Sequence, residues 1–126
     1  MRALPLALLM VGVLLAGCSD PGADGFTEPP KDEQGRYVVQ LTTSNTMVPA
    51  KANVPVGATV VWQVAPGGFH DVTSEAGAPE SFTSDSEFPS KMREGDEYAR
   101  KFAKAGDYPY RCAVHGTMML GTLRVR

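Results

Sequence analysis

Short runs of alternating apolar residues, separated by glycine and proline, constrain the fold of this chain more than any other feature of its sequence. The clearest run covers residues 59–64, where Val60, Trp62 and Val64 would share one face of a strand. Further β-rich runs cover residues 37–43, 53–56, 69–73, 97–102, 106–112 and 121–125. Short strands between turns, without a convincing amphipathic helix, predict an all-β, antiparallel Greek-key β-sandwich.

The first 17 residues have the features of an export signal. Arg2 supplies a positive start, and the apolar run at 4–15 is too short and too one-sided for a membrane span. The run ends in the letters LAGC, which resemble a bacterial lipobox with its lipid-modified cysteine. We therefore predict a lipoprotein signal peptide at 1–17 and lipidation of Cys18. The alternative is an ordinary signal peptide followed by a chance cysteine.

Residues 18–35 are rich in proline, glycine and acidic residues and have no apolar period. They predict a flexible tether, leaving 36–126 as one folded domain with room for a single core. The net charge of −2 argues against a nucleic-acid surface, which needs a basic excess. We expect an exported monomer, lipid-anchored to a membrane of the bacterial cell envelope and facing the periplasm or the exterior.

The few cysteines and histidines of the chain point to a metal site. The chain has only two cysteines and two histidines. If Cys18 carries lipid, Cys112 is a lone thiol in an oxidising compartment, and a bound metal is a good explanation for it. His115 and a methionine follow Cys112 within one short loop, and His70 is the only other histidine. Two histidines, a cysteine and a weak axial methionine describe a type 1 (blue) copper site with one ion per chain.

The segments around these residues resemble the cupredoxins, in particular the branch with plastocyanin, amicyanin and halocyanin. The resemblance covers about the last ninety residues and rests on GATVVWQV, GGFHDVTS and GDYPYRCAVHGTMMLGTLRV. It implies a cupredoxin-like sandwich with metal ligands at His70, Cys112, His115 and a methionine. The Met-x-Gly step into the last strand favours Met119 as the axial ligand, with Met118 as the alternative.

The resemblance also implies roles for three neighbours of the ligands. The backbone at Phe69 and Asp71 would lie next to His70, and the N–H of Asp71 would bond the thiolate sulfur. Many members of the family have asparagine at the position of Asp71, and plastocyanin and amicyanin usually have proline at the position of Val114. Because valine keeps its N–H, a second hydrogen bond to the sulfur of Cys112 is expected here.

Three functions compete for this chain. The first is a one-electron carrier that meets redox partner proteins transiently through a small uncharged patch around His115. The alternative is a copper-delivery or copper-buffering protein of the envelope that uses the same ligands. The third is a metal-free interaction domain. Catalysis is not expected, because the copper oxidases and nitrite reductases of this lineage need further copper centres and domains.

Overall fold

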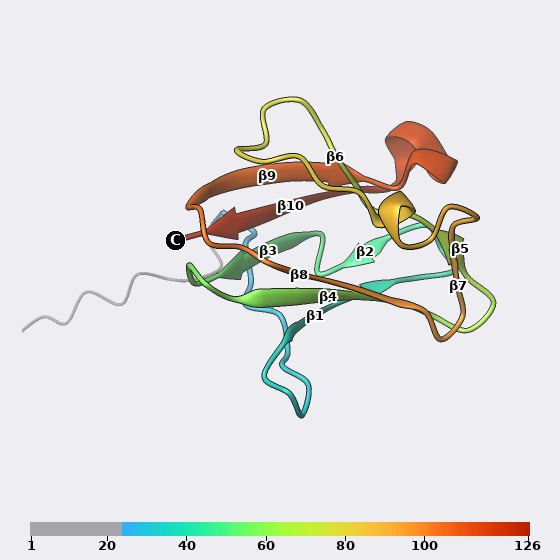
Figure 1. Ribbon diagram of the computed structural model, residues 1–126, viewed down its shortest axis with the longest axis horizontal. Helices are drawn as coiled ribbons and strands as arrows, with labels where there is room; N and C mark the ends of the chain where they lie inside the picture. Colours follow the sequence, from blue (N-terminus) through green and yellow to red (C-terminus); the bar gives the residue numbers. More distant parts are fainter. Residues whose placement is uncertain (1–23) are drawn as a thin grey trace, which may run out of the picture.

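The computed structural model describes residues 24–126, which form two stacked β-sheets (Figure 1). The predicted signal peptide at 1–17 and Cys18 lie outside the described residues. One sheet has the order β2-β1-β4-β8, the other has the order β3-β10-β9-β6, and β5 pairs with β7 in a separate ribbon. The strands are β1 (Tyr37–Leu41), β2 (Met47–Val48), β3 (Lys51–Val54), β4 (Thr59–Val64), β5 (Phe69–His70), β6 (Thr73–Ser74), β7 (Met92–Arg93), β8 (Glu97–Lys101), β9 (Gly106–Arg111) and β10 (Leu120–Val125).

The β-sandwich predicted from the sequence is confirmed, but its sheets are mixed rather than wholly antiparallel. Strand β1 runs parallel to β4, and β10 runs parallel to β3, while the remaining pairs are antiparallel. The parallel pairs arise because the chain changes sheets. After β2 it crosses to the second sheet as β3 and returns to the first as β4, so β4 repeats the direction of β1.

An aromatic cluster fills the space between the two sheets. The alternation in β4 turns Val60, Trp62 and Val64 inward, as the sequence predicted, and all three are buried. The ring of Trp62 packs at centroid distances of 5.5–6.1 Å against four other rings, in stacked and edge-on arrangements that aromatic pairs favour. These four rings belong to Phe82, Tyr98, Phe102 and Tyr110.

The last strand begins against the ring of Tyr110. Gly121 is the register partner of Tyr110 in the β9–β10 pair. A Cβ at Gly121 would lie only 2.5 Å from the Cζ atom of that ring. Only glycine therefore allows β10 to pass this ring, directly after the loop that carries the predicted ligands.

The segment 24–35 lies against the sandwich, although the sequence predicted it as part of a flexible tether. Thr27 exchanges two backbone hydrogen bonds with β3, at 3.0 and 2.9 Å. Phe26 is buried, with the guanidinium of Arg124 3.6 Å from its ring centroid. The folded part thus begins before residue 36. Backbone pairing and one aromatic side chain hold this segment, and neither produces a periodic pattern in the sequence.

Helical structure within residues 24–126 is limited to two 3-10 segments, η1 (Ser84–Ser86) and η2 (Ala113–Met118). No helix in this part of the chain has the length and apolar character needed to span a membrane. Segment η2 lies with β5 and β7 at one end of the sandwich, and the C-terminus lies at the other (Figure 1). Both histidines of the chain are therefore at the same end.

Candidate metal centre

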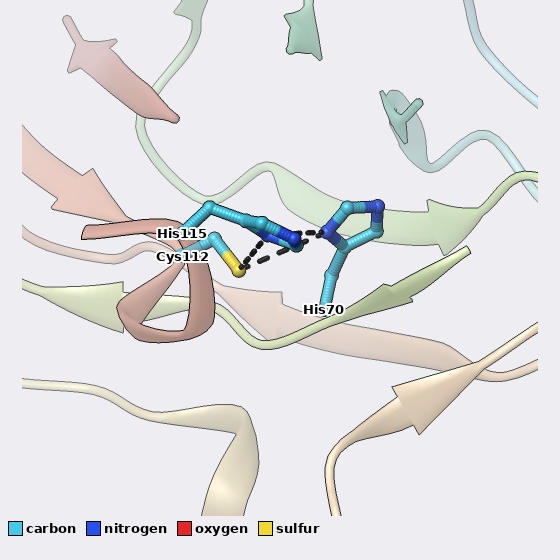
Figure 2. Close-up of side chains that lie close together, drawn as sticks. All are labelled: His70, Cys112 and His115. Carbon is cyan, nitrogen blue, oxygen red and sulfur yellow. Dashed lines mark hydrogen bonds between the residues drawn. The ribbon is translucent and has the colours of Figure 1, made fainter. Parts of the chain in front are cut away.

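Three of the predicted ligands converge at the end of the sandwich where β5 and η2 meet (Figure 2). The Nδ1 atoms of His70 and His115 lie 3.3 Å apart, and the Sγ atom of Cys112 lies 3.8 and 3.4 Å from them. A point equidistant from these atoms is about 2 Å from each, close to the length of a metal–imidazole bond. The donor set and spacing fit one copper ion in a trigonal His, His, Cys arrangement.

His70 is held in the form that can bind a metal. Its Nε2 atom lies 2.9 Å from the carbonyl oxygen of Thr42. A carbonyl only accepts hydrogen bonds, so Nε2 carries the proton and the lone pair of Nδ1 faces Cys112. Burial lowers the pKa of His70, and the nearby His115 contributes in the same direction. The ring is therefore predisposed to be neutral, as a metal ligand must be.

The turn before His70 requires glycine. A Cβ at Gly68 would lie 2.6 Å from the Cγ1 atom of Val64 and 3.3 Å from the imidazole Cδ2 of His70. After this turn, His70 pairs with Met92 across the β5–β7 ribbon. The close backbone approach and the ribbon together fix the position of the first histidine.

Cys112 is fully buried and sits at the start of the ligand loop. Burial raises the pKa of its thiol, whereas the backbone N–H groups of Asp71, His115 and Val114 lower it. The N–H of Asp71 donates to the sulfur at 3.4 Å, as the family resemblance implied. The N–H of Cys112 itself donates to the carbonyl of Met119 at 3.0 Å, which closes the loop.

The two adjacent methionines differ in environment. Met119 is 0 % exposed and belongs to the core, whereas Met118 is 78 % exposed. Between them and Cys112, the loop turns at Gly116, whose positive φ of 58° suits glycine. A metal held by the buried Cys112 would lie in the interior, so burial favours Met119 over Met118 as a further donor.

The surface above the site is partly apolar. His115 is half-buried, while His70 is 1 % exposed. The side chains of Val114 and Phe69 are both partly exposed, and the guanidinium of Arg93 lies 4.8 Å from the Phe69 ring centroid. A surface hollow beside the two histidines is lined by Thr43, Asn45, Gly67, Gly68, Phe69, His70 and His115.

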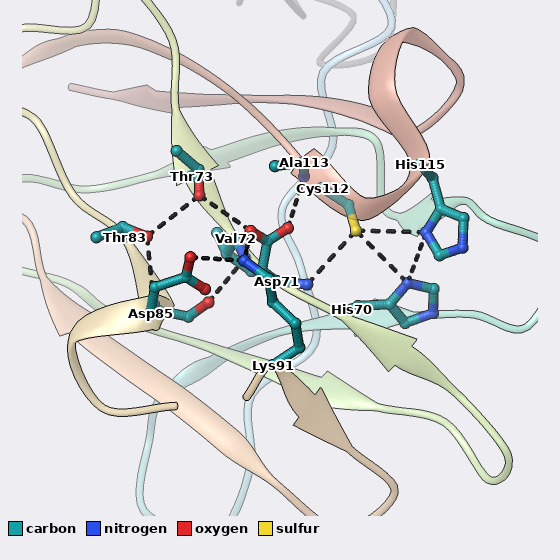
Figure 3. Close-up of polar contacts among 11 residues, drawn as sticks. His70, Asp71, Val72, Thr73, Thr83, Asp85, Lys91, Cys112, Ala113 and His115 are labelled. Carbon is teal, nitrogen blue, oxygen red and sulfur yellow. Dashed lines mark hydrogen bonds and ion pairs between the residues drawn. The ribbon is translucent and has the colours of Figure 1, made fainter. Parts of the chain in front are cut away.

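Two contributions to the site were missed in the sequence. The first is the turn at 42–45, which supplies the carbonyl of Thr42; the positive φ of Asn45 (59°) fits the Ser-Asn signal of a turn. The second is Lys91, whose ammonium lies 3.1 Å from the buried carboxylate of Asp71 (Figure 3). Residues twenty positions apart give no local pattern from which such a pair could be predicted.

Comparison with known proteins agrees with this geometry. Residues 38–126 match the family described as copper binding proteins, plastocyanin/azurin family. No match is found among curated protein sequences. A reduced variant of amicyanin is similar in structure, with a TM-score of 0.64 and 25% identity over 75% of this chain and 86% of amicyanin.

Two further solved structures are similar to this chain. A purple cupredoxin from Nitrosopumilus maritimus has a TM-score of 0.60 at 22% identity, over 71% of this chain and 98% of its own, and so supports the fold. A copper-containing nitrite reductase from Thermus scotoductus SA-01 has a TM-score of 0.63 at 27% identity. That match covers 85% of this chain but only 29% of the reductase chain.

Proposed function

The chain belongs to the plastocyanin/azurin family of copper-binding proteins, and from this membership we propose that it is a one-electron carrier with a single type 1 copper ion. The observation that carries the proposal is the convergence of His70, Cys112 and His115 to within 3.3–3.8 Å of one another. Copper bound there supplies a one-electron Cu(I)/Cu(II) couple. We propose Met119 as the weak axial ligand, on the strength of its burial beside the loop.

The contribution of the protein to electron transfer is to hold the metal ligands in fixed positions. The Thr42 carbonyl fixes the tautomer of His70, and the N–H of Asp71 bonds the sulfur of Cys112. The loop is closed by a backbone hydrogen bond between Cys112 and Met119. Because these contacts hold the ligands in place, little rearrangement is needed when a bound metal changes its charge.

His115 is the proposed point of electron exchange with partner proteins. Its ring is half-buried, so one edge can be approached from solvent while Nδ1 faces the site. The neighbouring side chains of Val114 and Met118 are exposed and uncharged. A small patch of this kind suits brief, weak encounters, which is what an electron carrier requires.

We further propose that the protein is a monomer, lipid-anchored through Cys18 in the bacterial cell envelope and facing the periplasm or the exterior. Asp24, six residues after Cys18, forms an ion pair with Arg124 near the end of β10. The ligand loop precedes the other end of β10. Lipid on Cys18 would therefore bring the end of the sandwich remote from the metal site to the membrane and leave His115 free for partners.

Detergent partitioning tests the anchor. Expressed in a bacterium with its own leader, the protein should partition with the membranes into detergent. Cys18→Ala should release it or block its processing, because no thiol remains to take the lipid. Equal partitioning of the two forms would show that the lipobox interpretation is wrong.

The copper function is tested by the visible spectrum of the purified, copper-loaded, oxidised protein. We expect an intense blue colour, reversible bleaching on reduction, and retention of copper in both states. Loss of copper to a chelator on reduction would instead indicate a copper-delivery or copper-buffering protein. We propose that the chain is not an enzyme, so nitrite added to the reduced protein should not be turned over.

A further inference from the structure

A buried carboxylate lies beside the proposed copper thiolate (Figure 3). The side chain of Asp71 has no exposed surface. Its Oδ1 atom accepts a hydrogen bond from the N–H of Ala113 at 2.6 Å, and its own N–H donates to the sulfur of Cys112 at 3.4 Å. One residue therefore holds both the sulfur and the backbone immediately after it, and it places a negative charge next to an anionic ligand.

Lys91 supplies the opposite charge. Its Nζ atom lies 3.1 Å from Oδ2 of Asp71 and 2.6 Å from Oδ2 of Asp85. The side chains of Lys91 and Asp85 are 26 % and 38 % exposed. The three charged groups therefore run from the buried Asp71 to the surface. Lys91 itself has a left-handed backbone, with φ of 68°, a conformation that residues other than glycine adopt rarely. The turn before β7 is thus held in an uncommon shape that presents this ammonium to the carboxylate.

The contacts favour the charged form of the Asp71–Lys91 pair. The ammonium of Lys91 lies within hydrogen-bond distance of both the buried Asp71 carboxylate and the Asp85 carboxylate. Removal of Lys91 or Asp71 would leave the other charge without its partner, so each member of the pair depends on the other.

We propose that Lys91 is a positioning residue of the metal site, acting through Asp71 to balance the carboxylate beside the Cys112 thiolate and thereby to set the reduction potential. The proposal rests on the proposed copper function. An unbalanced negative charge at this place favours the more highly charged oxidised state and lowers the potential. An unbalanced positive charge does the opposite. The intact pair of Asp71 and Lys91 has no net charge and holds the reduction potential between these limits.

Four variants test the proposal by the order of their reduction potentials. Asp71→Asn keeps the oxygen that accepts from Ala113 and leaves Lys91 positive, so its potential should be the highest. Lys91→Met has a side chain of similar length and leaves Asp71 negative, so its potential should be the lowest. The double variant Asp71→Asn/Lys91→Met removes both charges and should lie near the wild type. Lys91→Arg keeps the charge and should also remain near the wild type.

Each single neutralisation should shift the oxidised-to-reduced equilibrium by about tenfold relative to the double variant, equivalent to about 59 mV for one electron. Equal potentials in all variants, or shifts of the same sign for both single variants, would show that the pair only supports the loop. If Lys91→Met does not fold, the comparison of Asp71→Asn with the double variant still decides the result. Asp85→Asn serves as a control whose more exposed charge is screened by water and should shift the equilibrium less.

A readout on the metal-free protein separates this proposal from the copper function. Amide hydrogen exchange at Ala113 reports whether the Asp71 carboxylate is held in place. Lys91→Met should speed this exchange about tenfold or more, and Lys91→Arg should leave it near the wild-type rate. Unchanged exchange in Lys91→Met would overturn the positioning role even in a protein that turns blue. Failure of the wild type to take up copper would overturn the proposed function while leaving the exchange test intact.

Discussion

The body of the sandwich and its metal-binding end are held together by different interactions. In the body, the rings of Trp62 and Phe102 are fully buried between strands of five or six residues. At the metal end, strands β5 and β7 have two residues each. The side chains there are held in position by hydrogen bonds to His70, Cys112 and Asp71. The free energy gained by apolar burial depends mainly on the area buried, whereas the strength of a hydrogen bond depends on its direction and distance.

This difference separates stability from chemistry. Loss of a ring in the body leaves a cavity that the surrounding strands cannot fill. Loss of a polar contact at the metal end changes the position or charge of a ligand while the aromatic cluster stays packed. We therefore expect substitutions in the body to change the free energy of unfolding. We expect substitutions at the end to change the metal chemistry.

Cys112→Ser tests this separation most severely. The hydroxyl is a far poorer ligand than the thiolate, so the blue colour should disappear completely. The side chains are similar in size, so the metal-free variant should remain folded with a free energy of unfolding within about 2 kcal/mol of the wild type. Absorption spectra of the copper-loaded protein and denaturant unfolding of the metal-free protein measure the two effects. A variant that kept the intense colour would contradict the assignment of Cys112 as the thiolate ligand.

Trp62→Ala is the reciprocal change in the body. Removal of a fully buried indole should lower the free energy of unfolding by about 3–5 kcal/mol, a large fraction of the stability of a domain this size. Denaturant titration of the metal-free protein measures it. Phe69→Ala, a partly exposed ring at the metal end, is the matched control and should cost under about 1 kcal/mol. Equal costs for the two changes would mean that the body and the end do not differ as described.

The same contrast explains how much the sequence predicted. The body was predictable because Val60, Trp62 and Val64 repeat with the period of a strand and are buried together. The convergence of His70, Cys112 and His115 was predictable because the chain has only two histidines and, with Cys18 predicted to carry lipid, Cys112 was the only thiol left to join them. The copper-binding family and the β-sandwich inferred from these features are both confirmed.

The features missed in the sequence are those made by contacts between distant residues. The pairing of Lys91 with Asp71 joins two turns that no periodic pattern links. The two-residue strands β2 and β7 are too short to produce an alternation. The segment 24–35 has almost no apolar residues, so its docking through Phe26 and Thr27 could not be read from composition.

Phe26→Ala tests whether that docked segment belongs to the body. The ring is 7 % exposed and lies under Arg124, so its removal should cost about 2 kcal/mol of unfolding free energy by loss of buried apolar area. The copper spectrum should not change, because the segment is remote from the ligand loop. Unfolding by denaturant with and without copper measures both. An unchanged stability would restore the view of residues 24–35 as a tether.

Met119→Leu tests the axial position at the boundary between body and end. Leucine fills a similar volume, so the fold and colour should persist. Loss of the weak thioether donor favours Cu(I), and the reduction potential should rise by about 59 mV, a tenfold change in the equilibrium. Met118→Leu is the control: its side chain is largely exposed, and the potential should barely move. The reverse result would assign the axial ligand to Met118.

Val114→Pro makes the smallest and most specific change at the metal end. The N–H of Val114 lowers the pKa of the Cys112 thiol, as do the N–H groups of Asp71 and His115. Proline has no N–H and is tolerated in the first turn of a helical segment such as η2. Loss of the Val114 N–H should strengthen electron donation from the Cys112 sulfur to copper and so stabilise Cu(II).

The reduction potential of Val114→Pro should therefore fall by a few tens of millivolts, less than the 59 mV or so of a tenfold change. An intact blue spectrum shows that the proline has not displaced the ligands. Val114→Ala is the control, because it keeps the N–H and trims the same exposed side chain. If alanine and proline shift the potential equally, the effect comes from the surface near His115. If only proline lowers it, the sulfur of Cys112 accepts a second backbone hydrogen bond, and the metal end is tuned by single N–H groups in a way that the body is not.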